Sequence, residues 1–186
     1  MSGYCSRMPK PWKVLRRSTY RHSRFRAIED VDYELPTGEV RTYALKKEGR
    51  VVTVFPMTAD RQIVLARQFR PGPGRVLDEL PAGGVKEGES AADAAARELM
   101  EETGYRAERF ITLGNLLECA YSTIQRTAFV GLNCERVTEQ QLDLEEDIEV
   151  VLKSVPEFFQ QLRSGQSSDL EVGWAALEKL GFLKLV

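Results

Sequence analysis

Alternating apolar and polar residues predict paired strands in the first part of the chain. Strands are expected over residues 25–33 and 40–45. Between them, Pro36 presets φ and Gly38 takes a positive φ, which is typical of a tight turn and predicts an antiparallel hairpin. Further strands are expected over residues 51–57, 63–69, 76–80, 110–119, 127–134 and 145–151.

The centre of the chain predicts a helix with a capping residue at each end. Ser90 is the expected N-cap, and Asp93 three residues later forms an imperfect capping box. The Ala-rich stretch as far as Thr103 has high helix propensity, and Gly104 is expected to end the helix at the C′ position. Two closing helices are expected over residues 155–163 and 170–180.

The order of these elements favours an α+β fold with mixed sheets. Strands outnumber helices and stand beside one another as hairpins, whereas a doubly wound fold needs strict alternation of strand and helix. The chain of 186 residues, 42% of them hydrophobic, is long enough for one domain with a single core.

Three carboxylates crowd one face of the central helix. At 100° per residue, Glu98, Glu101 and Glu102 fall within an arc of about 100°. A separate apolar stripe is formed by Ala92, Ala95, Ala96, Leu99 and Thr103. The carboxylate face is therefore expected to point to solvent or a cleft, where Mg²⁺ would offset the like charges. The alternative is a solvated acidic face in which Arg97 pairs with Asp93 or Glu101.

The spacing around this helix resembles the Nudix box, G-x5-E-x7-R-E-U-x-E-E-x-G-U, where U is apolar or aromatic. Gly83 stands first, Glu89 follows after five residues, and residues 97–105 complete the pattern with every fixed position filled. From average composition, a chance match is about 10⁻⁹ per start point. The resemblance implies the Nudix fold, in which mixed β-sheets are sandwiched between helices.

The Nudix resemblance also implies roles for the box residues. The implied metal ligands are the backbone carbonyl of Ala82 and the carboxylates of Glu98, Glu101 and Glu102, with Mg²⁺ as the cofactor and Mn²⁺ as a substitute. Glu101 and Glu102 are also implied to be catalytic, because the bound metal orients and acidifies the attacking water. Structural roles are implied for Gly83, Glu89, Arg97 and Gly104, with Glu89 and Arg97 forming an ion pair between loop and helix.

Segments outside the box are similar to the ADP-ribose and nucleotide-sugar pyrophosphatase branch of the family. These segments are RQFR at 67–70, LDELPAG at 77–83, PWKVL at 11–15 and EEDIEV at 145–150. Arg67 and Arg70 are expected to form a fork for diphosphate oxygens, since guanidinium groups bind phosphate in bidentate fashion; an exposed strand with no partner is the alternative. Glu79 is implied to face the cleft as a further ligand or substrate contact.

Two further features bear on the branch. Its members commonly activate water with a glutamate in the loop before the last strand, which implies Glu145 or Glu146 here. ADP-ribose hydrolases usually carry a proline about sixteen residues past the box, but residues 120–126 contain none. This departure leaves room for other nucleotide sugars.

The N-terminal region is basic, since residues 1–28 carry only Lys and Arg as charged groups. Such a run fits phosphate binding, a solvated strand face or an Arg-rich targeting peptide. The branch usually forms homodimers through N-terminal strands that reach the partner's nucleotide, which implies substrate contacts for Arg24, Arg26 and Tyr33. We expect a flexible tail over 1–10, a β-strand region for dimerisation over 11–47 and a catalytic domain over 48–186.

Composition excludes several other classes. The single histidine, His22, makes catalytic triads and HExxH zinc sites implausible, and Cys5, Cys119 and Cys134 lack metal-like spacing and are expected to be reduced thiols. No stretch has the length of apolar sequence that a membrane span needs, and no secretory signal core is found. The chain is therefore expected to be soluble and cytoplasmic, with no membrane partner.

The sequence thus predicts an enzyme that hydrolyses ADP-ribose or another nucleoside diphosphate sugar to a nucleoside monophosphate and a sugar phosphate. One alternative is hydrolysis of RNA 5′ ends or dinucleotide polyphosphates, for which the basic run would supply salt-dependent affinity, although a nucleic-acid partner is not favoured. Another is a Nudix-like module that binds a nucleotide without cutting it.

Overall fold

The computed structural model describes residues 8–23 and 26–183, which fall into two compact units. The smaller unit contains the chain up to Glu48 together with Cys119–Ile124. The larger unit contains Gly49–Glu118 and the chain from Gln125 onward. Among the described residues, no helix is long and apolar enough to cross a membrane.

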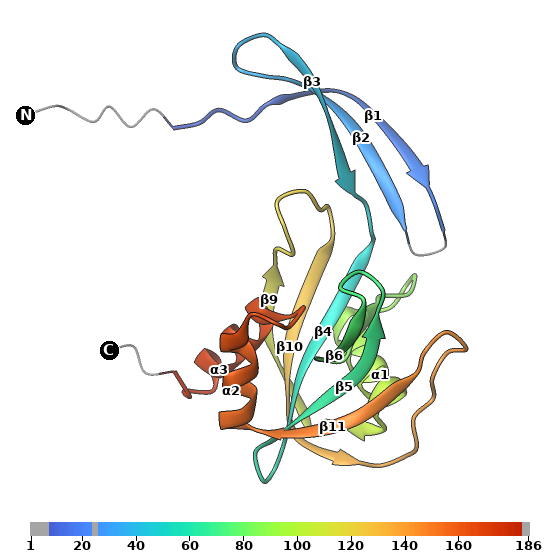
Figure 1. The fold of residues 1–186 in the computed structure, drawn as a ribbon, viewed down its shortest axis with the longest axis vertical. Helices are drawn as coiled ribbons and strands as arrows, with labels where there is room; N and C mark the ends of the chain where they lie inside the picture. The colour runs from blue at the N-terminus through green and yellow to red at the C-terminus, as the bar shows by residue number, and fades with distance from the viewer. Residues whose placement is uncertain (1–7, 24–25, 184–186) are drawn as a thin grey trace, which may run out of the picture. The chain divides into compact units, whose positions relative to one another are not determined.

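The smaller unit is a three-stranded antiparallel sheet in the order β1-β2-β3 (Figure 1). The strands are β1 Lys13–Arg21, β2 Ala27–Glu34 and β3 Val40–Lys46. The predicted turn between β2 and β3 is present, with Gly38 at φ 86° donating its amide to the carbonyl of Leu35 at 2.9 Å. β1 adds a strand to the expected hairpin.

The larger unit is built on a mixed sheet in the order β11-β5-β4-β10-β8, with β6 on β5, β7 on β4 and β9 on β10. Strands β11, β5, β4 and β10 of this sheet are labelled in Figure 1. The strands are β4 Arg50–Thr58, β5 Gln62–Arg70, β6 Arg75–Glu79, β7 Ala82–Gly84, β8 Tyr105–Arg106, β9 Arg109–Leu116, β10 Gln125–Arg136 and β11 Ile148–Ser154. β4 and β10 pair in parallel, whereas the other pairs are antiparallel.

Three helices cover this sheet: α1 Ala91–Thr103, α2 Val155–Ser164 and α3 Leu170–Lys179. The expected caps of α1 are present, since Ser90 accepts a hydrogen bond from the amide of Asp93 at 3.1 Å and Gly104 has φ 74°. Burial of the apolar faces against the sheet stabilises these short helices, which would be marginal alone.

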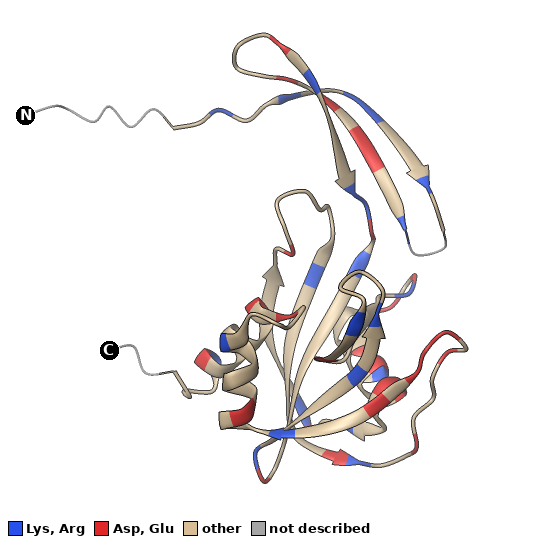
Figure 2. Cartoon of the chain, in the orientation of Figure 1, with Lys and Arg blue, Asp and Glu red and all other residues tan. Residues whose placement is uncertain are grey.

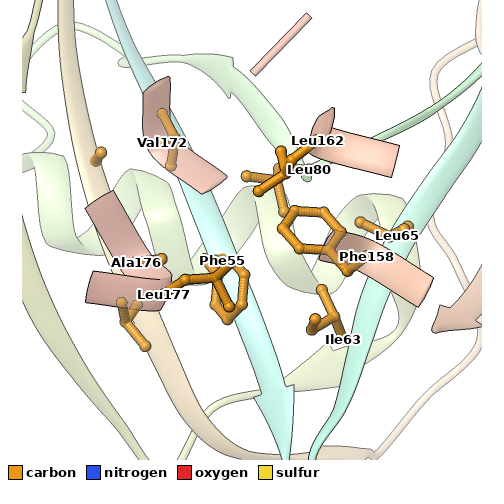
Figure 3. Packing of buried hydrophobic residues seen from close by; sticks show 11 residues of the cluster. Phe55, Ile63, Leu65, Leu80, Phe158, Leu162, Val172, Ala176 and Leu177 are labelled. Atoms are coloured by element: carbon orange, nitrogen blue, oxygen red, sulfur yellow. The ribbon is translucent and has the colours of Figure 1, made fainter. Parts of the chain in front are cut away.

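The core lies on both faces of β4, because successive strand residues point to opposite sides. Val52 and Val54 pack against α1. Phe55 packs against α2 and α3, meeting the ring of Phe158 edge-on at 5.4 Å between centroids (Figure 3). The sheet is therefore sandwiched between helices, which confirms the α+β fold.

Three sequence expectations need correction. The last strand begins at Ile148, so Glu145 and Glu146 lie in the preceding turn. The short strands β7 and β8 were not expected. On α1 the buried residues are Ala94, Ala95, Leu99, Glu102 and Thr103. The buried arc therefore includes Glu102, which was expected to face solvent or a cleft.

Candidate active site

The loop between β6 and α1 is held against the glutamates of the helix. The backbone amide of Ala82 donates to Glu102 Oε2 at 3.1 Å, and Glu102 is only 4% exposed. A Cβ built on Gly83 would collide with the carboxylate of Glu98. The first glycine of the box is therefore needed for the close approach of loop and helix.

Arg97 ties together the acidic side chains of the box. Its guanidinium donates to both oxygens of Glu89, at 2.8 and 3.0 Å, and to Glu98 and Glu101 at 2.8 Å each. It also donates to the carbonyl of Gly84 at 2.8 Å. The expected ion pair with Glu89 is thus present, and the bond from Arg97 lowers the pKa of Glu89 to about 2.

Glu98 and Glu102 lie in an environment that disfavours their charged form. Burial raises the pKa of Glu98, against the opposing effect of Arg97, and nearby Glu101 and Glu146 raise it further. Burial raises the pKa of Glu102 well above its usual value, and the neighbouring Glu98 and Glu146 add to the rise. The cluster therefore has an electrostatic need for a cation.

The donor set fits Mg²⁺, which prefers oxygen ligands and retains waters for substrate phosphates. Glu98 accepts from Arg97 through Oε1, and Glu102 accepts from Ala82 through Oε2. The other oxygen of each carboxylate could therefore bind a metal ion. Within the described part of the chain, no group of three His, Cys, Asp or Glu side chains is in position to hold a metal ion. Water and substrate oxygens would have to complete the shell.

The loop before β11 lies at the C-terminal end of α1. The side chain of Gln140 donates to the carbonyl of Glu102 at 2.6 Å and to that of Ile148 at 3.0 Å. Figure 2 shows acidic residues on α1 and on this loop. Of the two glutamates expected to activate water, Glu146 is close enough to raise the pKa of Glu98 and Glu102.

The structure does not bring Arg67 and Arg70 together as a fork. They are three positions apart on β5, and side chains at this spacing point to opposite faces of a strand. Arg67 donates to Asp78 at 2.6 and 3.2 Å and to Glu149 at 3.3 Å. Arg70 instead pairs with Glu79 and opposes the rise in the pKa of Glu102. Of these two arginines, Arg70 is therefore the one that lies near a box glutamate.

Glu79 is buried rather than open to a cleft. It is 2% exposed, and it accepts hydrogen bonds from Arg70 and, at 2.5 Å, from the hydroxyl of Ser168. Ser168 also contacts the buried Asp169, which accepts from the amide of Leu80 at 3.3 Å. Sequence reasoning missed Ser168 and Asp169, because nothing in the local pattern before α3 distinguishes them from ordinary helix-start residues.

The expected N-terminal contact residues lie in the smaller unit. Arg24 falls outside the described residues, and Arg26 pairs with Glu48. Tyr33 meets Trp12 and Tyr43 with ring centroids 5.8 and 5.9 Å apart. These rings line an open hollow of about 510 Å³ within the smaller unit.

A second hollow, of about 580 Å³, lies between the β5 to β6 hairpin and α2. It is lined by polar and apolar side chains, among them Arg67, Asp78, Lys153 and Gln161. Two of its cations are already paired, since Asp78 binds Lys153 at 2.6 Å as well as Arg67. It does not include the box glutamates.

Comparison with known proteins decides the family. The sequence model described as the NUDIX domain matches residues 47–183. The chain belongs to the Nudix family. The matched residues include α1 and the loop before it, so the whole box lies within the matched domain.

Individual Nudix relatives match part of the chain. An ADP-ribose pyrophosphatase of Bacillus subtilis is 39% identical over 82 residues, covering 44% of this chain and 43% of that protein. A mouse ADP-sugar pyrophosphatase is 40% identical over 92 residues, covering 44% and 42%. The matches thus span less than half the length of these curated relatives.

A solved structure matches nearly the whole fold. The crystal structure of an ADP compounds hydrolase superposes with a TM-score of 0.77, covering 95% of this chain and 97% of that one at 22% identity. At this identity the likeness shows that the two chains share a fold.

Proposed function

We propose that this protein is a metal-dependent Nudix hydrolase that cleaves the pyrophosphate bond of ADP-ribose or another nucleoside diphosphate sugar. The products would be a nucleoside monophosphate and a sugar phosphate. The observation that carries this proposal is the close packing of Glu98 and Glu102 against the Ala82 and Gly83 loop. The relatives named ADP-ribose pyrophosphatase and ADP-sugar pyrophosphatase support the substrate class.

The box residues would hold the metal. Glu98 and Glu102 would provide carboxylate oxygens, and Ala82 would provide its carbonyl. Glu101, whose Oε2 accepts from Arg97, would have to turn toward the metal to add a third carboxylate, since no three such side chains are in position among the described residues. When bound, Mg²⁺ or Mn²⁺ would neutralise charge on the diphosphate and lower the pKa of the attacking water. The raised pKa values of Glu98 and Glu102 support this assignment, because a cation would relieve the unfavourable burial of their charges.

Side chains around the box would bind the diphosphate and handle the proton of water. Arg70 is the proposed diphosphate contact, since only its Nε is engaged by Glu79 and its side chain is 41% exposed. Its two terminal amino groups can therefore donate to phosphate oxygens. Glu146 or Glu145, in the loop before β11, would accept the proton of the attacking water.

The remaining assignments concern assembly and location. We propose that residues 11–47 mediate homodimerisation and that 48–186 form the catalytic domain. Exposed aromatic and apolar side chains on the smaller unit, including Trp12, Val14 and Tyr20, support a protein contact there. A cytoplasmic location is proposed because Cys119 and Cys134 are free thiols.

The test is a substrate panel with Mg²⁺. Purified protein would be incubated with ADP-ribose, ADP-glucose, UDP-glucose, GDP-mannose, diadenosine polyphosphates and 5′-triphosphorylated RNA, and the products separated by anion exchange. Release of nucleoside monophosphate from sugar-linked diphosphates is the expected result. Cleavage of RNA or dinucleotides alone would favour the alternative hydrolase, and no cleavage at all would favour a binding module.

A matched pair of variants separates turnover from binding. Glu98→Gln combined with Glu102→Gln should abolish turnover, whereas a binding module would keep its ligand. Glu135→Gln serves as the control, because Glu135 is an exposed residue whose recorded partner is Arg106. The control should keep the activity of the unmodified protein.

A further inference from the structure

A chain of hydrogen bonds runs from the start of α3 to Arg70. The hydroxyl of Ser168 contacts Glu79 Oε1 at 2.5 Å and Asp169 Oδ2 at 3.0 Å. Glu79 in turn accepts from Nε of Arg70 through its other oxygen, Oε2. The hydroxyl and the guanidinium therefore hold the two oxygens of one buried carboxylate.

This arrangement fixes Glu79 from two directions. Glu79 is 2% exposed, so solvent gives it little help in keeping its orientation. If the hydroxyl were removed, Oε1 would lose its recorded donor in a buried place, which is unfavourable for a carboxylate. The carboxylate would be expected to turn, and Arg70 would lose the rigid partner that orients its planar guanidinium.

The three residues after Glu79 are also held by hydrogen bonds. Asp169 accepts from the amide of Leu80 at 3.3 Å, Val54 donates to the carbonyl of Pro81 at 2.9 Å, and Glu102 accepts from the amide of Ala82. Ser168 and Asp169, at the start of α3, thus hold Glu79 and Leu80, which directly precede the proposed metal-binding loop.

We propose that Ser168 is a positioning residue that holds Glu79 so that Glu79 presents Arg70 to the diphosphate of the substrate, an inference that rests on the proposed function. Ser168 touches neither substrate nor metal in this role. It acts through Glu79 on the affinity for substrate, because Arg70 contacts the diphosphate before and during its cleavage.

The test compares substitutions of Ser168 in the full-length chain with ADP-ribose as the probe. Ser168→Ala should raise KM about tenfold and leave kcat nearly unchanged, as expected for loss of a hydrogen bond to a charged group in substrate binding. Ser168→Thr should keep KM close to that of the unmodified protein, since threonine retains the hydroxyl and position 168 is exposed enough to take the added methyl group. Ser164→Ala is the matched control, because the hydroxyl of Ser164 bonds to the carbonyl of Gln161 and not to Glu79 or Arg70.

A double-mutant cycle tests whether Ser168 acts through Arg70. In an Arg70→Ala background, Ser168→Ala should cause little further rise in KM, because the group being positioned is gone. Additive effects in the cycle, or a lower melting temperature without a change in KM, would overturn the inference and leave Ser168 as a stabiliser of α3.

Failure of this inference can be told from failure of the proposed function. The dissociation constant for ADP-ribose would also be measured with EDTA present, where no turnover complicates binding. If the unmodified protein neither binds nor hydrolyses any panel member, the proposed function fails and the inference with it. If the unmodified protein is active and Ser168→Ala matches it in KM and dissociation constant, the positioning role alone is overturned.

Discussion

The carboxylate of Glu102 accepts a hydrogen bond from the backbone amide of Ala82 at 3.1 Å inside the protein. The bond joins the loop of the Nudix box to its helix at the point where the residue after Ala82 must be glycine. Single substitutions at this junction can therefore test what each residue of the box contributes to activity and stability.

Gly83→Ala should damage function more than stability. The added Cβ would meet the end of the Glu98 side chain, which can swing away at small cost to folding but would leave its position as a metal ligand. We expect activity at limiting Mg²⁺ to fall by about ten- to a hundredfold, with a change in unfolding free energy below about 1 kcal/mol. Gly84→Ala is the control, since its Cβ would meet nothing within 4 Å; equal losses in both variants would contradict the prediction.

Glu102→Gln should separate charge from shape. The glutamine side chain can still accept the hydrogen bond from Ala82. The substitution removes a buried carboxyl group whose pKa is raised by burial and by Glu98. Without metal, urea unfolding should show a variant at least as stable as the unmodified protein. Turnover should fall by about a hundredfold or more, and Mg²⁺ should no longer raise the melting temperature. A variant that keeps full turnover would show that Glu102 is not part of the machinery.

Arg97→Lys should destabilise the box. Lysine cannot reproduce the two parallel bonds to Glu89 together with the bonds to Glu98, Glu101 and the carbonyl of Gly84. Because the Arg97 side chain is 19% exposed, we expect a loss of about 1 to 3 kcal/mol in urea unfolding.

The control for Arg97→Lys is Arg106→Lys. Arg106 pairs with Glu135 at 2.7 Å, but both side chains are more than half exposed. Surface pairs of this kind contribute about 0 to 1 kcal/mol, so the control should unfold close to the unmodified protein. Similar losses in the two variants would mean that the Arg97 cluster adds no more than a surface ion pair.

Asp169 should give stability a distinct dependence on pH. Burial raises the pKa of Asp169 from 3.8 to about 6, against the opposing effect of Arg126. A raised pKa in the folded state means that the stabilising contribution of the protonated form is full below 3.8 and is lost as pH rises through about 6. The unmodified protein should therefore lose about 1 to 3 kcal/mol relative to Asp169→Asn over this interval. Urea unfolding at a series of pH values measures the difference, and a difference of the opposite sign would refute the assignment.

The parts of the fold that depend on local sequence could be predicted. The turn at Gly38 and the two caps of α1 need only residues close in sequence, and each is present as expected. The pattern of the box likewise placed Arg97 beside Glu89, because both lie on one short loop and helix. By contrast, β1 lies within the expected β-strand region 11–47 but was not given bounds of its own. Eight of its nine residues are exposed, and it lacks the apolar alternation that is typical of a half-buried strand.

The remaining features depend on contacts between distant segments. The helix wheel placed Glu102 with the exposed acids, but β7 and its loop cover that side of α1 and bury it. The fork of Arg67 and Arg70 is an exception, because local strand alternation already argues against it: residues three apart on a strand point to opposite faces. The contact of Glu79 with Ser168 joins residues at distant points of the chain, and no local pattern could have revealed it.

The parallel pairing of β4 with β10 has a consequence for the order of folding. Arg50 pairs with Gln125, although β5, β6, β7, α1, β8 and β9 come between them along the chain. Closing so long a loop costs entropy before the ladder of hydrogen bonds can offset it, so such pairings form slowly. During synthesis on the ribosome, the residues of α1 emerge before those of β10. The apolar face of the α1 segment, which packs against residues of both β4 and β10, therefore stays incompletely covered until β10 has been synthesised.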